Sequence, residues 1–458
     1  MKVTSERRAR AAMIPVSLVA LLLLAHVPPD IARGAQAPEL ATTILANSDF
    51  PIVLAQAKSL LKTGLNAGGS YGGEVWIRDL NTFIDLALDA ETQPSIRTAL
   101  LSFMQFQDEH IGIPDGYTPV AGATGPYEYI RVDSLPQFLA FKNTVETDQE
   151  SSLVQAVARY VRKTGDRAIL DEVIHGESVR THLAQALRYP LAQRFSAEFG
   201  LIWGATTVDW GDVQPETNRG TAFDKNNSHP AISVYDNAMF ILALDRYVDL
   251  VGPSGPHAAE FKETAAQLRR QVRTHLWDAA RHKFRPHLYL HGSPFPPDFD
   301  EDRIYYHGGT AVAIEAGLLT TDEIRLVLGD MINDKRFSGA ASIGLTVFPA
   351  YPNGWFKNPM MTPYAYQNGG DWTWFGGRMI QQLVAHEFTA EAYQEILPMV
   401  ARVRRDHGFF EWYTLANEPR GSGTYRGAAG VLGRAIEMLV GWAEAHRSPG
   451  LRQPLIDD

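Results

Sequence analysis

Apolar residues recur along this chain mainly with the period of an amphipathic α-helix. In one run they fall at relative positions 0, 3, 4, 7 and 8, on one helical face: Leu80, Phe83, Ile84, Ala87 and Leu88. The same template fits runs near residues 50–63, 94–108, 153–161, 167–187, 235–244, 261–272, 310–330, 377–403 and 428–445. The pattern therefore predicts about a dozen helices.

Long polar and aromatic segments rich in Gly, Pro and Asn separate these runs, near residues 66–78, 110–135, 203–233, 284–307, 339–375 and 406–427. Loops of this length inside a compact chain are usually functional. Residues 284–290 are compatible with a short strand, but no stretch alternates enough to predict a large sheet. The rhythm of helix, long loop, helix favours an all-α fold. We expect one domain over residues 38–458, an (α/α)6 toroid of six helical hairpins whose loops gather at one end.

The N-terminus has the organisation of an export signal. An apolar run over residues 13–25 follows a basic segment that contains Lys2, Arg7, Arg8 and Arg10. The run is shorter than a membrane-spanning helix requires. Small residues follow, and cleavage is compatible with a site after Gly34 or Ala37. We therefore expect residues 1–37 to be a signal peptide, the mature protein to be periplasmic or secreted, and no stable membrane insertion after cleavage.

The amino-acid composition and the absence of certain motifs argue against several classes of function. The 458 residues are 45% hydrophobic and 21% charged, as in ordinary globular proteins, and the net charge of −10 gives no electrostatic reason to bind nucleic acid. There is no cysteine, and the 14 histidines show no metal-ligand spacing. Motifs for a serine nucleophile, a phosphate loop or a dinucleotide are absent from the sequence. We therefore expect neither a metal nor a cofactor.

Two carboxylates stand among aromatic residues in separate loops. Asp209 and Trp210 lie in the segment TTVDWGDVQPE, and Glu411 lies in FFEWY. Burying an acid among aromatic rings is costly unless the acid is paired or used in chemistry. A carboxylic acid that protonates the leaving oxygen and a carboxylate that activates water together hydrolyse a glycosidic bond. Asp212 is an alternative to Asp209 as the acid.

Other loop residues are candidate sugar ligands. Arg78 and Asp79 follow Trp76 directly before a helix, and Asp148 likewise opens a predicted helix further along the chain. Each aspartate either caps its helix or accepts hydrogen bonds from sugar hydroxyls. The segment PYAYQNGGDWTW is dense in aromatic and amide side chains and is typical of a pocket wall, with Gln367, Asn368 and Trp372 as candidates. For His229 and His307 we favour structural roles.

These motifs, in this order, resemble the six-hairpin (α/α)6-barrel glycosidases, nearest to the alkaline and neutral invertases, with amylo-α-1,6-glucosidases and trehalases more distant. The segments that carry the resemblance cover most of residues 70–440: VWIRDLNTFIDLAL, DQESSLVQAVARYVRKTGD, the loop of Asp209 with His229–Pro230, YQNGGDW, and FFEWY followed by Gly421, Tyr425 and Gly427. Three departures argue against sucrose as substrate: DWGD in place of the invertases' DRR, Gln367 in place of their histidine, and the export signal.

The resemblance implies an inverting glycoside hydrolase with Asp209 as general acid and Glu411 as general base. It implies that Arg78, Asp79 and Asp148 bind the non-reducing sugar of a small saccharide, and the neighbouring Trp76, Trp210, Asp212, Gln367, Asn368 and Trp372 are further candidate binders. Tryptophans from four loops predict a closed pocket and therefore exo-action on a short α-glucoside or related saccharide. Three alternatives remain: a sugar phosphorylase, an epimerase on the same barrel, and a barrel that binds sugars without cutting them.

Overall fold

The computed structural model describes residues 29–447, with side chains from residue 37, apart from Glu91, 109–111, Pro126, 206–209, 211–212 and 217–222. In this described part the chain forms thirteen α-helices and short strands of two to four residues. The prediction of an all-α chain of about a dozen helices is confirmed. The first helix, α1 (Pro29–Leu45), spans both cleavage positions considered above. The remainder of the predicted signal peptide lies outside the described residues, and the signal stays a prediction.

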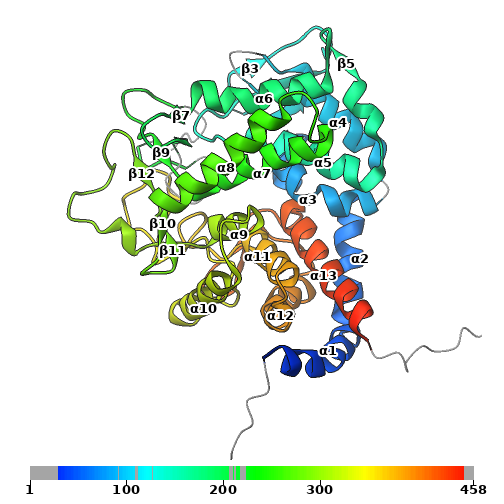
Figure 1. The fold of residues 1–458 in the computed structure, drawn as a ribbon, viewed down its shortest axis with the longest axis vertical. Helices are drawn as coiled ribbons and strands as arrows, with labels where there is room; N and C mark the ends of the chain where they lie inside the picture. The colour runs from blue at the N-terminus through cyan, green and yellow to red at the C-terminus, as the bar shows by residue number, and fades with distance from the viewer. Residues whose placement is uncertain are drawn as a thin grey trace, which may run out of the picture.

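Six of the described helices form an inner ring. They are α3 (Ile77–Asp89), α5 (Gln149–Thr164), α7 (Val234–Val251), α9 (His307–Glu315), α11 (Thr373–Ala385) and α13 (Arg426–His446). Each contacts the next in this order, and α13 returns to contact α3. The two helices lie side by side although they come from opposite ends of the chain (Figure 1).

The outer helices alternate with the inner ones along the chain. They are α2 (Asp49–Leu61), α4 (Gln93–Gln105), α6 (Val179–Gln193), α8 (Ala258–His275), α10 (Thr321–Ser338) and α12 (Thr389–Asp406). Burial follows the sequence pattern of each layer. The inner helix α9 is buried at every position from His307 to Ile314, whereas α8 buries one stripe that includes Phe261, Ala265, Leu268 and Val272. A helix apolar all round belongs between neighbours, and a helix with one apolar stripe belongs outside.

Two predicted helical runs each contain a break. Residues 310–330 hold the end of α9 and the start of α10, and residues 377–403 hold parts of α11 and α12. Gly317 has φ 69° and Glu387 has φ 67°, and this left-handed conformation ends a helix. The run near 167–187 begins later than expected, because residues 167–171 form a 3-10 helix and α6 starts at Val179. Apolar periodicity continued across these breaks and concealed them.

The loops contain small strand pairs. A four-stranded antiparallel sheet has the order β1 (Val75–Trp76), β2 (Gly116–Pro119), β4 (Phe138–Phe141), β3 (Tyr129–Ile130). The remaining described strands form antiparallel pairs. Of these strands, several lie on one side of the molecule (Figure 1): β7 (Phe195–Ser196), β9 (Ala231–Ile232), β10 (Trp277–Asp278), β11 (Lys283–Phe284) and β12 (Leu288–Tyr289). The strand expected in residues 284–290 is present as β12. The sheet that includes part of residues 110–135 was not predicted, because its strands are too short to show alternation.

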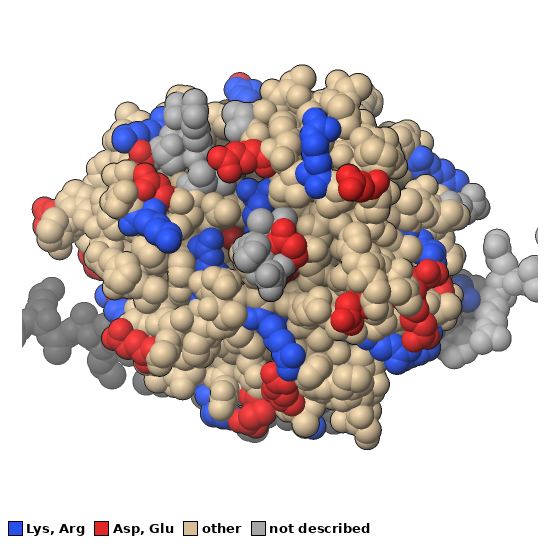
Figure 2. All heavy atoms as spheres, turned by 90° about the horizontal axis from the view of Figure 1, so that it is seen from above, with Lys and Arg blue, Asp and Glu red and all other residues tan. Residues whose placement is uncertain are grey.

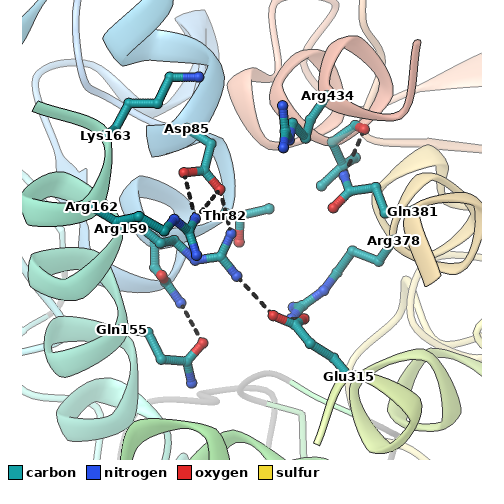
Figure 3. A network of polar contacts seen from close by, with 12 residues as sticks. Thr82, Asp85, Gln155, Arg159, Arg162, Lys163, Glu315, Arg378, Gln381 and Arg434 are labelled. Atoms are coloured by element: carbon teal, nitrogen blue, oxygen red, sulfur yellow. Dashed lines mark hydrogen bonds and ion pairs between the residues drawn. The ribbon is translucent and has the colours of Figure 1, made fainter. Parts of the chain in front are cut away.

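A charged network crosses the interior of the ring (Figure 3). Arg159 on α5 donates to Asp85 on α3 (Nη1–Oδ2 2.7 Å) and to Glu315 on α9 (Nη2–Oε1 3.2 Å), and Arg378 on α11 faces the same glutamate (3.5 Å). Burial alone would raise the pKa of Asp85, but Arg159 and Arg162 outweigh it and hold that pKa below its ordinary value. The pKa of Glu315 is lowered against burial by Arg159 and Arg378. The network therefore joins four inner helices through paired charges.

Charged side chains of both signs are mixed on the face of the molecule seen in Figure 2. They are interspersed among uncharged ones, without a broad area of one sign. None of the helices among the described residues is both long enough and apolar enough to cross a membrane.

Candidate active site

A small cavity of about 100 Å³ lies where inner helices begin. Trp76 immediately precedes α3, Trp372 precedes α11 and Tyr425 precedes α13, and all three side chains line the cavity. The further lining residues that matter below are Tyr71, Arg78, Asp79, Glu146, Trp210, Tyr366, Gln367 and Trp374. Helix N-termini carry a partial positive charge, so this end of the ring favours anionic groups.

Aromatic rings form one wall of the cavity. The ring of Trp210 meets those of Trp372 and Trp374 edge to face, with centroids 5.0 and 4.9 Å apart. The indole N–H of Trp372 donates to the carbonyl oxygen of Tyr366 (2.8 Å), which fixes the ring. Such rings present apolar faces suited to the C–H surface of a sugar. Trp76, Trp210, Trp372 and Trp374 line this cavity, whereas Trp412 is not part of its lining.

Several polar atoms of the lining are buried without a hydrogen-bond partner among the described residues. They are Asp79 Oδ1, both amide atoms of Gln367, and the indole nitrogens of Trp210 and Trp374. A buried polar atom without a partner costs about 1–3 kcal/mol, and native proteins keep few of them. Donors and acceptors therefore converge on one small space, as a ligand with several hydroxyl groups would require.

Arg78, in the cavity lining, is held by two carboxylates. Its guanidinium binds Asp148 through two hydrogen bonds (Nε–Oδ2 2.6 Å, Nη2–Oδ1 2.9 Å) and pairs with Glu146. Tyr235 also donates to Asp148 (2.9 Å). Asp148 is the N-cap residue of α5, but its side chain makes no capping bond. It does not line the cavity, so its geometry is that of a group that positions Arg78.

Asp79 occupies the first turn of α3 and also makes no cap. Its pKa is raised to about 6: burial is the largest cause, Arg78 and a hydrogen bond from Tyr425 oppose it, and Glu411 and Asp148 act in the same direction as burial. The nearby positive charge of Arg78 is shared with Asp148 and Glu146, so it compensates Asp79 only in part. An acid with Oδ1 free and a pKa near neutrality can accept or donate a hydrogen bond to a hydroxyl group.

Glu411 is buried (5% exposed) beside Tyr71 of the lining. Its Oε1 accepts hydrogen bonds from the hydroxyl of Tyr71 (2.7 Å) and from the backbone N–H of Ser422 (3.1 Å). Burial raises the pKa of Glu411, and these two donors lower it. Gly421 crosses over the carboxyl group with φ 72°, and a Cβ there would lie 2.6 Å from Glu411 Cδ. One carboxylate oxygen is thus held by two donors, and the other lies against Gly421; Glu411 itself is not part of the cavity lining, which it reaches through Tyr71.

The remaining predicted site residues differ in whether they line the cavity. Gln367 and Trp372 line the cavity, whereas Asn368 is fully buried in its loop, where it bonds to the backbone of Tyr351 and Met361. Asp209 and Asp212 lie outside the described residues, so the choice between them stays open. His307 bonds to Asp334 (2.9 Å), which fits the structural role expected for it.

Sequence reasoning missed Tyr71, Glu146 and the contact of Tyr425 with Asp79. Tyr71 belongs to a long loop that was identified only by its length, and its partner Glu411 lies 340 residues further along the chain. Tyr425 precedes α13 and was quoted only as part of a motif. No cluster of metal-ligating side chains was found among the described residues, which include no cysteine.

The ring of helices, with a cavity at the N-termini of its inner helices, is the fold of solved (α/α)6-barrel glycosidases. No family model and no curated protein sequence matches the chain. A solved GH63 mannosylglycerate hydrolase from Thermus thermophilus, in complex with glucose, is similar over 84% of this chain and 99% of that one, with TM-score 0.59 and 14% identity. A rhamnosidase from Klebsiella oxytoca with rhamnose bound is similar over 86% and 64%, with TM-score 0.57 and 14% identity.

These similarities confirm, at the level of the fold, the predicted relation to six-hairpin glycosidases. A GH78 rhamnosidase from a Bacillus species shares the fold over 84% of this chain and 34% of that one, with TM-score 0.56 and 14% identity. The proposed nearness to invertases, amylo-α-1,6-glucosidases and trehalases is not confirmed and stays a prediction.

Proposed function

We propose that this protein is an exported, inverting, exo-acting glycoside hydrolase of a short α-glucoside or related saccharide. The observation that carries the proposal is the cavity itself: aromatic walls and buried polar atoms without partners among the described residues converge beside Glu411. The fold shared with solved glycosidases, two of which hold glucose or rhamnose, supports the same conclusion.

In the proposed reaction Glu411 is the general base. Its Oε1 is held by Tyr71 and Ser422, so Oε2 accepts a proton from the attacking water as the water adds to the anomeric carbon. The bond from that carbon to the glycosidic oxygen breaks, and the departing oxygen takes a proton from the general acid. We assign the acid to Asp209, with Asp212 as the alternative. Inversion requires a separation of roughly 6.5–9.5 Å between the two carboxyl groups.

The binding of the terminal sugar follows from the lining. Asp79 Oδ1 and the amide of Gln367 face hydroxyl groups, Trp210 and Trp374 donate through their indole nitrogens, and Arg78 is oriented by Asp148. A cavity of about 100 Å³ admits one end of a saccharide, which supports exo-action. The proposal places this cavity within the loop end of a closed (α/α)6 toroid.

A substrate panel tests the proposal. Purified protein is incubated with nitrophenyl glycosides, maltose, kojibiose, isomaltose, trehalose and sucrose, with and without phosphate, and released sugar is measured. We expect turnover of at least one α-glycoside that does not depend on phosphate and is lost in Glu411→Gln. Phosphate-dependent release of a sugar phosphate would identify a phosphorylase. Binding of saccharides without turnover would leave only a sugar-binding barrel.

Export is a separate part of the proposal. It is tested by expressing the full chain in a bacterium with an outer membrane and sequencing the N-terminus of the protein in the periplasmic fraction. We expect a mature chain that begins after Gly34 or Ala37. A full-length chain that stays in the cytoplasm would contradict export and would not affect the proposed activity.

A further inference from the structure

A second, larger cavity lies beside the same loop. It has a volume of about 640 Å³ and is lined by Gln214, Glu216, Asp224, His229, Trp355 and Lys357 among others. None of these residues lines the first cavity.

The two cavities are close enough for one short substrate. Trp210 lines the first cavity and Gln214 the second, and four residues of chain span at most about 14 Å. Tyr366 of the first cavity also packs against the buried cluster of Tyr351 and Phe356, against which Trp355 packs. A substrate that occupied both cavities would hold one sugar unit in the first and its leaving group in the second.

Trp355 provides a fixed aromatic wall. Its ring stacks on that of Phe295 (centroids 5.2 Å apart, planes at 24°) and meets Phe299 edge to face (4.4 Å, 81°). The residue remains partly exposed at the cavity. A rigid, partly exposed indole is suited to stacking against the apolar face of a sugar ring.

The polar lining favours hydroxyl groups over a carboxylate. Glu216 Oε1 accepts a hydrogen bond from His229, while Oε2 is buried and has no partner among the described residues. Glu216 and Asp224 contribute two formal negative charges, and Lys357 contributes one positive charge. Among the described lining residues an anionic leaving group would meet an excess of like charge, which is unfavourable, whereas a neutral leaving group with hydroxyl groups would not.

We infer that the second cavity binds the leaving group and that this leaving group is a neutral, hydroxyl-rich unit such as a second sugar, stacked on Trp355. The inference rests on the proposed glycosidase function. It extends that function by naming the chemistry on the far side of the cleaved bond.

The experiment uses four probes that share the preferred terminal sugar: the glycosyl fluoride, the disaccharide, its alditol and its aldonate. The fluoride leaves the second cavity empty, and the alditol and aldonate differ mainly in charge. We expect the wild type to hydrolyse the alditol with a kcat/KM about tenfold above that for the aldonate, because like charges repel. Trp355→Ala is expected to lower kcat/KM for the disaccharide about tenfold and to leave the fluoride within about twofold, since only the disaccharide stacks on the indole.

Two variants provide controls. Phe337→Ala removes an aromatic ring that is 79% exposed on α10, and should change none of the four rates. Glu216→Gln removes one negative charge and leaves the aromatic wall unchanged. It should therefore lower the ratio of kcat/KM for the alditol to kcat/KM for the aldonate. This test remains valid even if Trp355→Ala does not fold.

The outcomes separate the two proposals. If no probe is hydrolysed, both the function and this inference are wrong. If the fluoride is hydrolysed but the aldonate is preferred, the inference alone is wrong. The inference alone is also wrong if Trp355→Ala slows hydrolysis of the fluoride and of the disaccharide equally. It is likewise wrong if Glu216→Gln leaves the ratio of the alditol rate to the aldonate rate unchanged.

Discussion

Two aspartates on the same helix show how the ends of the ring differ. Asp79 stands in the first turn of α3 and Asp85 lies six positions further along. Burial raises the pKa of Asp79 to about 6, whereas Arg159 and Arg162 outweigh burial and lower that of Asp85. The arginine beside Asp79 is shared with two other carboxylates, and the arginines around Asp85 bind it directly.

The comparison distinguishes a binding end from a structural end. Around Asp79 the lining keeps polar atoms without partners among the described residues, which lowers stability and leaves hydrogen bonds for a ligand. Around Asp85 the charges are paired across four helices, which fixes the ring that carries the cavity (Figure 3). Substitutions at the first end should change activity, and substitutions at the second should change stability.

The largest effect is expected for Glu411→Gln at the binding end. The amide cannot accept the proton of the attacking water, so kcat should fall roughly 10²- to 10⁴-fold. The change also removes a buried carboxyl whose pKa is raised, so the melting temperature should be equal to or above that of the wild type. Steady-state kinetics and calorimetry measure the two quantities. Activity within tenfold of the wild type would exclude Glu411 as the base.

Asp85→Asn should give the largest loss of stability. The substitution leaves Arg159 buried without its partner on α3, and breaking a buried ion pair in this way costs about 3–5 kcal/mol. The pKa of Asp85 is lowered in the folded protein, so the stabilisation is present at neutral pH and lost as pH falls through that lowered pKa. Calorimetry at pH 7 and at pH 3 measures both effects.

Asp89→Asn is the matched control, because Asp89 lies on the same helix and pairs with Lys163 (2.6 Å) in a partly exposed position. Its loss should cost less than about 1 kcal/mol. Equal losses in the free energy of unfolding for the two variants would show that the interior network contributes no more to stability than a partly exposed ion pair.

Asp79→Asn should stabilise the protein, the opposite of the effect expected for Asp85→Asn. The pKa of Asp79 rises from 3.8 to about 6 on folding, so the folded protein is penalised progressively as pH increases from about 4 to 6, and the penalty is complete above 6. Removing the charge should therefore stabilise the protein at pH 8 by about 3 kcal/mol, from about two pKa units at about 1.4 kcal/mol each. The gain should disappear by pH 4, while affinity for the sugar falls at both pH values. Thermal denaturation of Asp79→Asn that matches the wild type at pH 8 would contradict the assigned pKa.

Tyr71→Phe should produce the smallest change. Burial raises the pKa of Glu411, so the acid limb of kcat/KM should lie above its ordinary 4.5, and Tyr71 lowers that pKa by a hydrogen bond. Removing the hydroxyl should move the limb to higher pH, because the base must be ionised to act. A pH–rate profile that shifts towards lower pH would exclude this role for Tyr71.

Local pattern located most of the helices and part of the site, although it missed the breaks within residues 310–330 and 377–403. Apolar stripes such as that of α8 directly reflect one-sided burial, and tryptophans next to predicted helix starts proved to line one cavity. Tertiary partners were not predictable. Asp148 was expected to contact a sugar or cap its helix, but its oxygens are taken by Arg78, 70 residues earlier in the chain. Asn368 looked like a pocket residue, yet the turn geometry of its loop directs the amide to the backbone.

The central claim is that Glu411 activates water for a single displacement at the anomeric carbon. Proton NMR of the first sugar released from an α-glycosidic substrate tests it most directly, because the anomer is read before mutarotation. A single displacement predicts that the β-anomer forms first and that Glu411→Gln releases neither anomer. Initial release of the α-anomer would show retention and would contradict the assignment of Glu411 as a general base.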